Sequence, residues 1–93
     1  MKRMLLWCVS LPLLAQAQTE DMKCYVTLEG GAQMVLQQPV ADTSKANLAR
    51  VFKQKGYEID GVVRAVTEVI ECVPLAATFS LAEAKKQDEV QPR

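Results

Sequence analysis

The stretch that decides the fold of this chain is MKCYVTLEGGAQMVLQQ, residues 22–38. Apolar side chains alternate with polar or aromatic ones in residues 22–29, and the alternation resumes in residues 32–38. A period of two places alternate side chains on one face of a strand. Between the two runs, Gly30 and Gly31 accept the positive φ angles that tight turns require. The stretch therefore predicts a β-hairpin.

A helix and a third strand are predicted to follow the hairpin. The segment Asp42–Ser44 offers capping side chains, residues 45–55 carry apolar side chains on one helical face, and Gly56 is a typical C-terminal stop. After a polar connection at 57–61, residues 62–73 are rich in β-branched side chains and predict one continuous strand. Its alternation predicts two faces, with Val62, Val66, Ile70 and Cys72 on one and Val63, Ala65, Thr67 and Val69 on the other.

These elements predict a small α+β domain at residues 18–79. Its order is β-β-α-β, with an antiparallel sheet, one helix packed on a face and one disulfide. Pro39 and Pro74 are expected to end the second and third strands, because proline has no N–H to donate. Residues 80–93 are predicted to be a charged C-terminal tail that is a short helix or disordered, with Ser80 as a helix cap.

Residues 1–17 have the features of a secretory signal peptide. Lys2 and Arg3 precede an apolar run at 4–14, and Ala15-Gln16-Ala17 resembles a cleavage site. The apolar run is shorter than the roughly 20 residues that a membrane-spanning helix needs. We therefore expect a periplasmic or secreted protein of a Gram-negative bacterium, with no membrane insertion after cleavage.

Cleavage leaves two cysteines, Cys24 and Cys72, since Cys8 belongs to the signal peptide. An even pair in an oxidising compartment predicts a disulfide. A disulfide holds its Cα atoms within about 7 Å, so the first and last strands are expected to lie side by side. Two cysteines in a chain without histidine make at most half of a zinc site, and their spacing is unlike a CxxC redox motif. No metal and no cofactor are expected.

Charge and composition also argue against nucleic acid and catalysis. Without the signal peptide, nine basic residues stand against eleven acidic ones, and the signs are interspersed, which gives no basic face for nucleic acid. The absence of histidine removes every Ser-His or Cys-His arrangement. Glu58 with Asp60, or Glu68 with Glu71, could supply an acid and a base, but solvated surface carboxylates are the better interpretation. We expect no catalytic residue and no enzymatic activity.

Several features favour a protein partner whose identity the sequence does not give. The two tyrosines are either exposed interface anchors or core residues. An edge strand at 32–38 offers strand addition, and the tail at 82–93 offers a segment that either folds on a partner or is a plain disordered terminus. The candidate partner-binding residues are Tyr25, Tyr57, Glu29, Gly30 and Gly31.

Several short motifs are spread over residues 18–93. They are Lys-Cys-Tyr-Val at 23–26, Gly-Gly at 30–31, Val-Ile-Glu-Cys-Val-Pro-Leu at 69–75, Phe79 and a charged tail that ends in Pro-Arg. This arrangement resembles the TapY2 family, small exported proteins associated with type IV pilus or type IVa secretion systems. The resemblance implies an accessory role in the cell envelope, with Cys24 and Cys72 as the bridge. It implies no mechanism.

The leading hypothesis is a non-enzymatic periplasmic accessory protein that binds other proteins, such as components of pilus assembly or secretion. The alternative is a small secreted inhibitor of a hydrolase, a protease or a lysozyme, that presents a rigid loop to an active site. Inhibition would depend on residues 29–32 or 58–61. An enzyme that uses Glu68 or Glu71 is the third hypothesis.

Overall fold

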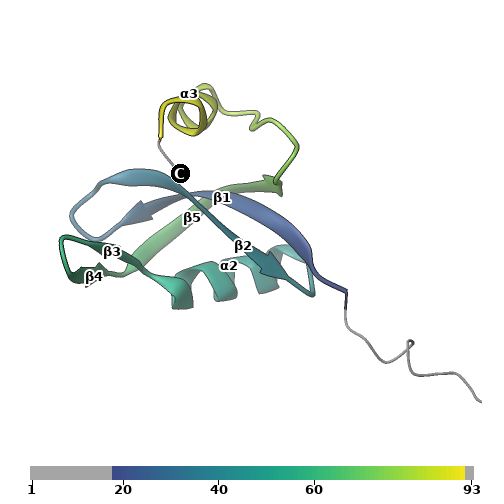
Figure 1. The fold of residues 1–93 in the computed structure, drawn as a ribbon, viewed down its shortest axis with the longest axis horizontal. Helices are drawn as coiled ribbons and strands as arrows, with labels where there is room; N and C mark the ends of the chain where they lie inside the picture. The colour runs from purple at the N-terminus through teal and green to yellow at the C-terminus, as the bar shows by residue number, and fades with distance from the viewer. Residues whose placement is uncertain (1–17, 92–93) are drawn as a thin grey trace, which may run out of the picture.

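The computed structural model describes residues 18–91, so the predicted signal peptide at 1–17 and the final residues 92–93 lie outside the described part. The elements are β1 (Glu20–Leu28), β2 (Gln33–Val40), α2 (Lys45–Lys55), β3 (Tyr57–Ile59), β4 (Val62–Arg64), β5 (Val66–Pro74) and α3 (Ala82–Val90). Strands β2, β1 and β5 form an antiparallel sheet in that order, and β3 pairs with β4. Helix α2 covers one face of the sheet and α3 the other (Figure 1). The predicted α+β class is confirmed.

The predicted hairpin is present as β1 and β2. Gly31 N–H donates to the Leu28 carbonyl at 2.9 Å, and Gly30 and Gly31 have φ angles of 92° and 96°. Positive φ is the conformation for which glycine has no steric penalty, so the turn needs these two residues. Pro39 does not end β2 as predicted, because β2 continues to Val40. Strand β2 is at the edge of the sheet, where a missing N–H breaks no ladder bond.

The disulfide joins the first and last strands, as predicted. Cys24 and Cys72 are directly opposite in the β1–β5 ladder, with their Cα atoms 4.1 Å apart. Leu75 N–H donates to the Asp21 carbonyl, and alternation along an antiparallel ladder then makes the cysteine pair a non-hydrogen-bonded one. Such pairs bring opposite Cα atoms closest together, which suits a bridge.

The predicted single strand at 62–73 is wrong in two respects. Strand β5 starts only at Val66, and its pairing with β1 shifts register twice, which leaves Thr67 and Ile70 without a partner residue. A bulge of one residue reverses which face the following side chains occupy. Val69 therefore packs beside Val66 and Cys72 under α2, whereas Ile70 packs on the opposite face, so the predicted alternation fails at these two residues.

The segment predicted as a polar connection is instead half of a second hairpin. Tyr57–Ile59 pairs with Val62–Arg64, and the turn residues Asp60 and Gly61 have φ angles of 53° and 81°. Two successive positive φ angles fit a type I′ turn, for which Asp-Gly is a favoured sequence. The Asp60-Gly61 dipeptide is the local sequence signal for this hairpin.

Two apolar clusters lie on opposite faces of the sheet. The cluster under α2 is the larger one and includes the fully buried Phe52. Helix α2 starts as predicted, because the Ser44 side chain accepts from Asn47 N–H at 3.3 Å, and it ends at Gly56. The cluster under α3 contains Tyr25, Val35, Phe79 and Ala84. The prediction of a single helix on one face therefore missed the second layer.

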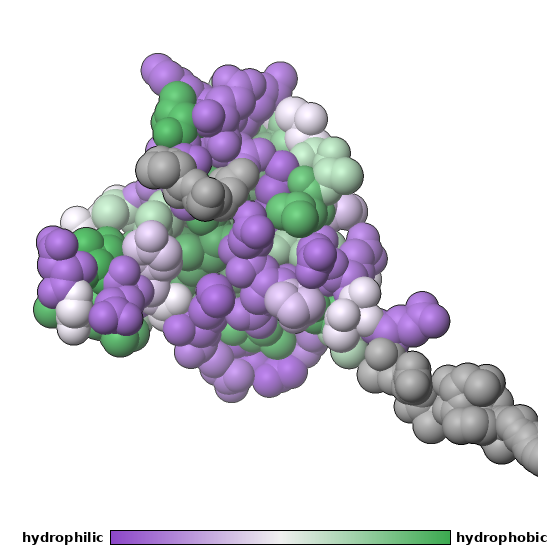
Figure 2. Space-filling model, viewed as in Figure 1, coloured by the Kyte–Doolittle hydropathy of each residue, from purple (hydrophilic) through white to green (hydrophobic). Residues whose placement is uncertain are grey.

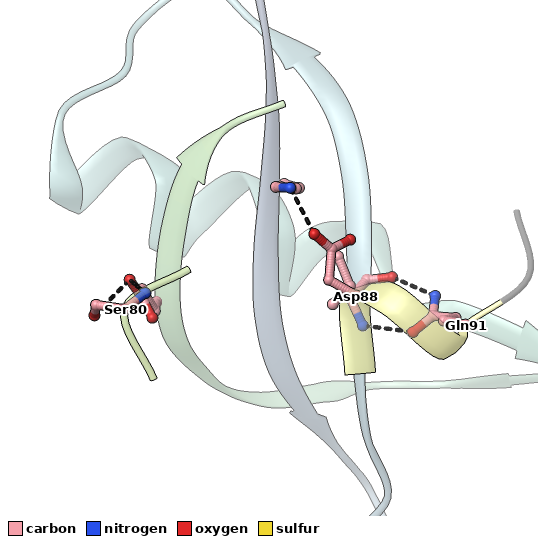
Figure 3. Close-up of polar contacts among 6 residues, drawn as sticks. Ser80, Asp88 and Gln91 are labelled. Carbon is pink, nitrogen blue, oxygen red and sulfur yellow. Dashed lines mark hydrogen bonds and ion pairs between the residues drawn. The ribbon is translucent and has the colours of Figure 1, made fainter. Parts of the chain in front are cut away.

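Polar contacts join helix α3 and its flanking residues Ser80 and Gln91 to all three strands of the sheet (Figure 3). Glu71 of β5 accepts from Ser80 N–H and Oγ–H at 2.8 and 2.9 Å. Lys23 of β1 donates to Asp88 Oδ2 at 2.6 Å, and Gln91 bonds the backbone of Val35 in β2. Ser80 does not cap the helix as predicted: the N-cap is Leu81, which has no side-chain hydrogen bond.

Candidate interaction surfaces

The carboxylates considered for catalysis lie on two different parts of the fold, the β3–β4 hairpin and strand β5. Glu58 and Asp60 lie on the exposed β3–β4 hairpin. Glu71 accepts three hydrogen bonds, from Ser80 N–H, Ser80 Oγ–H and Leu81 N–H, while Glu68 is exposed on β5. Within residues 18–91 no group of three or more His, Cys, Asp or Glu side chains is placed to hold a metal ion.

Two carboxyl groups have lowered pKa values, and both accept hydrogen bonds from residues at the start of a helix. Burial raises the pKa of Glu71, but hydrogen bonds from Ser80 and Leu81 outweigh burial and the net pKa is lowered. The backbone N–H of Ser44, followed by its side chain, lowers the pKa of the exposed Asp42. Hydrogen bonds to a carboxylate favour its ionised form. Each group is held ionised by the start of a helix, so neither is poised as a proton donor at neutral pH.

The structure separates the two candidate tyrosines. Tyr25 is 6 % exposed and lies under α3, with its ring 6.4 Å from that of Phe79 and its hydroxyl donating to Gln33 Oε1 at 3.0 Å. Of the two roles considered for the tyrosines, Tyr25 therefore has that of a core residue. Tyr57 is half-buried against the α2 cluster and lines a groove beside β2. Of the two side chains, that of Tyr57 is the more exposed.

The turn residues Glu29, Gly30 and Gly31 lie at the end of the molecule that also carries the β3–β4 hairpin (Figure 1). Glu29 N–H donates to the Ala65 carbonyl at 2.9 Å, and Glu29 Oε1 accepts from Ala65 N–H at 3.3 Å. A Cβ atom on Gly30 would be 3.3 Å from the guanidinium of Arg64. We call the surface formed by residues 29–31 and 60–64 the hairpin end.

The hairpin end exposes two large apolar side chains that are not among the predicted partner-binding residues. Val62 is 58 % and Val63 is 67 % exposed. Adjacent strand residues point to opposite faces, so β4 is uncovered on both sides. The space-filling view shows hydrophobic residues among hydrophilic ones on this projecting hairpin (Figure 2). The sequence signal for an exposed pair here is the position of Val62 and Val63 directly after the Asp60-Gly61 turn.

Two grooves border the edges of the sheet. One, of about 420 Å³, lies between α2 and β5 and is lined by residues that include Lys45, Leu48, Val69 and Cys72. The other, of about 410 Å³, lies beside the outer edge of β2 and is lined by Val35, Leu36, Gln37, Lys55, Gly56, Tyr57, Glu58 and Gln91. We call the second groove the β2-edge groove. Both grooves are lined in part by residues of the sheet.

Comparison with known proteins gives one match. The family model described as "Type IVa secretion system protein TapY2-like" matches residues 3–93. A search of curated proteins and a search of solved structures each found no match. No helix within residues 18–91 is long and apolar enough to cross a membrane. The Cys24–Cys72 disulfide and a secretion-system family both indicate an extracytoplasmic protein. The match covers nearly the whole chain, and the chain therefore belongs to the TapY2-like family of type IVa secretion system proteins.

Proposed function

We propose that this protein is a non-enzymatic accessory protein of the periplasm that binds a protein component of type IV pilus or type IVa secretion machinery. The family supports the link to secretion. The predicted signal peptide and the disulfide support a periplasmic or secreted location. The absence of histidine from the sequence and the commitment of Glu71 to Ser80 support a role in binding rather than catalysis.

The observation that carries the proposal is the exposure of Val62 and Val63 at the hairpin end. Exposed apolar side chains on both faces of a short strand outside the main sheet offer apolar contacts to a partner. The surrounding backbone is fixed, because Glu29 and Ala65 bond each other twice and Arg64 Nη1 lies 3.5 Å from the Glu29 carbonyl. A surface that is ordered before binding loses less conformational entropy when the complex forms.

The test is site-specific photocross-linking in the periplasm of the protein's own host. A photoreactive phenylalanine analogue replaces Val63 in one variant and the exposed Lys53 of α2 in the control. We expect a secretion or pilus component to be cross-linked through position 63 and not through position 53. Equal cross-linking from both positions, or no cross-link to such a component, contradicts the proposal.

A second candidate function is inhibition of a hydrolase such as a protease or lysozyme. It is favoured by one observation: the loops at 29–32 and 58–61 belong to tight turns at the same end of the molecule. Paired rigid loops suit insertion into an active site. Recovery of a soluble hydrolase through position 63, together with inhibition of that hydrolase by the purified protein, would select this function over the first.

A further inference from the structure

The outer edge of β2 carries a regular row of backbone hydrogen-bonding groups. Leu28 N–H donates to the Ala32 carbonyl at 2.8 Å, which makes this the first hydrogen-bonded pair of the β1–β2 ladder. Bonded and non-bonded pairs alternate along an antiparallel ladder. Gln33, Val35 and Gln37 therefore direct their N–H and C=O groups away from β1. Since β2 is an edge strand, these groups face outward from the sheet.

The middle position of this row is occupied by a side-chain amide of the same chain. Gln91 Oε1 accepts from Val35 N–H at 2.9 Å, and Gln91 Nε2 donates to the Val35 carbonyl at 2.7 Å (Figure 3). Gln87 Nε2 also donates to Gln91 Oε1 at 3.0 Å. In a hydrogen-bonded pair of an antiparallel ladder, one residue likewise offers a carbonyl oxygen and an N–H to the residue opposite. The Gln91 amide thus stands in for a peptide backbone.

Space for a longer backbone lies next to this amide. The β2-edge groove runs beside Val35 and Gln37 and is bounded opposite by Lys55, Tyr57 and Glu58. Among the described residues, the outward backbone groups of Gln33 and Gln37 have no hydrogen-bond partner in the structure. The groove carries one cationic and one anionic side chain, so its contacts favour no net charge in the ligand.

We propose that the β2-edge groove is a strand-addition site for an extended segment of another protein, and that Gln91 is the internal occupant which this segment replaces. Main-chain hydrogen bonds supply the affinity in this mode of recognition, and pockets for alternate side chains supply the specificity. Tyr57 forms the wall of the groove that such side chains contact. Val62 and Val63 are not among the residues that line the groove, and the inference does not depend on the partner at the hairpin end.

The first step of the test establishes that Gln91 occupies the edge. Amide hydrogen exchange is measured on oxidised wild type and on Gln91→Ala, each without the predicted signal peptide. The variant is expected to lose protection at Val35 while Leu36, which bonds within the β1–β2 ladder, stays protected. An unchanged Val35 amide would overturn the premise that the glutamine covers this group.

The second step measures binding with a displayed library of random decapeptides as the probe. Selected peptides are expected to bind Gln91→Ala about tenfold more tightly than wild type, because they no longer compete with two internal hydrogen bonds. Gln37→Pro is the blocking variant. Residue 37 is exposed and its N–H faces outward, so proline removes an edge donor without breaking a ladder bond. Gln37→Ala is its matched control.

The proposal is supported if the peptides shift the amide signals of Gln33, Val35 and Gln37, and if Gln37→Pro abolishes binding that Gln37→Ala retains. Three results overturn it. The first is a library that yields no binder to either wild type or Gln91→Ala. The second is a set of binders that Gln37→Pro leaves unaffected. The third is self-association of Gln91→Ala through β2 in sedimentation experiments, with no peptide binding, which would assign the edge to a second copy of this chain.

Discussion

Reduction of the Cys24–Cys72 bridge is expected to remove a large share of the stability of this fold. The bridge spans a sequence separation of 48 residues. The loop-closure entropy of a cross-link of this length corresponds to about 4 kcal/mol at 25 °C. A domain of this size has a total free energy of unfolding of roughly 4–11 kcal/mol, at about 0.05–0.15 kcal/mol per residue. The expected loss is therefore a large share of the total.

The assay is urea unfolding, followed by circular dichroism, of the oxidised protein, the reduced protein and a Cys24→Ala/Cys72→Ala variant. The reduced protein is the control for packing, because it keeps both sulfur atoms in the core where Cys24 is fully buried. The reduced protein is expected to lose about 3–4 kcal/mol, and the alanine variant more, since it also leaves a small cavity. A difference of less than about 1 kcal/mol between oxidised and reduced protein would refute the reasoning.

Three further changes test how the layers are joined. Glu71→Gln is expected to cost about 1 kcal/mol at pH 7. Because the pKa of Glu71 is lowered in the folded state, the stability advantage of wild type is present above pH 4.5 and is lost as the pH falls through the folded pKa. Urea unfolding of both proteins at pH 7 and pH 3 checks this. Lys23→Met is expected to cost about 2–3 kcal/mol, because Lys23 is 5 % exposed and pairs with Asp88 at 2.6 Å, and Lys23→Met/Asp88→Leu is expected to recover part of this loss in thermal unfolding. Gly56→Ala is expected to cost about 1–3 kcal/mol in the same assay, because φ is 65° and the new Cβ would lie 3.1 Å from Val63 Cγ1; a cost near zero would contradict the reported backbone conformation.

The parts of the fold that the sequence predicts are those where one local rule acts alone. Gly30 and Gly31 have no competing role, so the turn chemistry and the flanking alternation agree and the hairpin is confirmed. The pairing of Cys24 with Cys72 is confirmed for a similar reason, because two cysteines outside the signal peptide leave one connectivity. The Ser44 cap is confirmed because the following helix has a clear apolar face.

The misses come from contacts between distant residues. No local pattern marks the bulges at Thr67 and Ile70, whose effect is to present Val69 to α2 and Ile70 to Tyr25. Helix α3 buries only Ala84 and is joined to the sheet through polar contacts, so its sequence shows no sustained apolar face. A helix attached in this way cannot be assigned a position by periodicity.

The candidate site was predictable only in its turn residues, because the exposure of the other residues depends on contacts between distant parts of the chain. The turn residues Glu29, Gly30 and Gly31 lie on the hairpin end, but the sequence predicts Val62 and Val63 as part of the third strand, and their exposure is evident only in the structure. Any strand residue is exposed or covered according to what packs on it, and that is a tertiary property. The partner-binding roles of Glu29 and Tyr57 stay predictions.

The most direct test of the central claim is a quantitative affinity capture from envelope extracts of the host. The bait is the oxidised protein without the predicted signal peptide, compared with a Val62→Glu/Val63→Glu variant whose circular dichroism spectrum matches that of wild type. Both valines are more than half exposed, so the charges are not expected to disturb the core. The account predicts that a pilus or secretion component is enriched by wild type and lost with the variant. Equal recovery by both proteins, or enrichment of no such component, would contradict it.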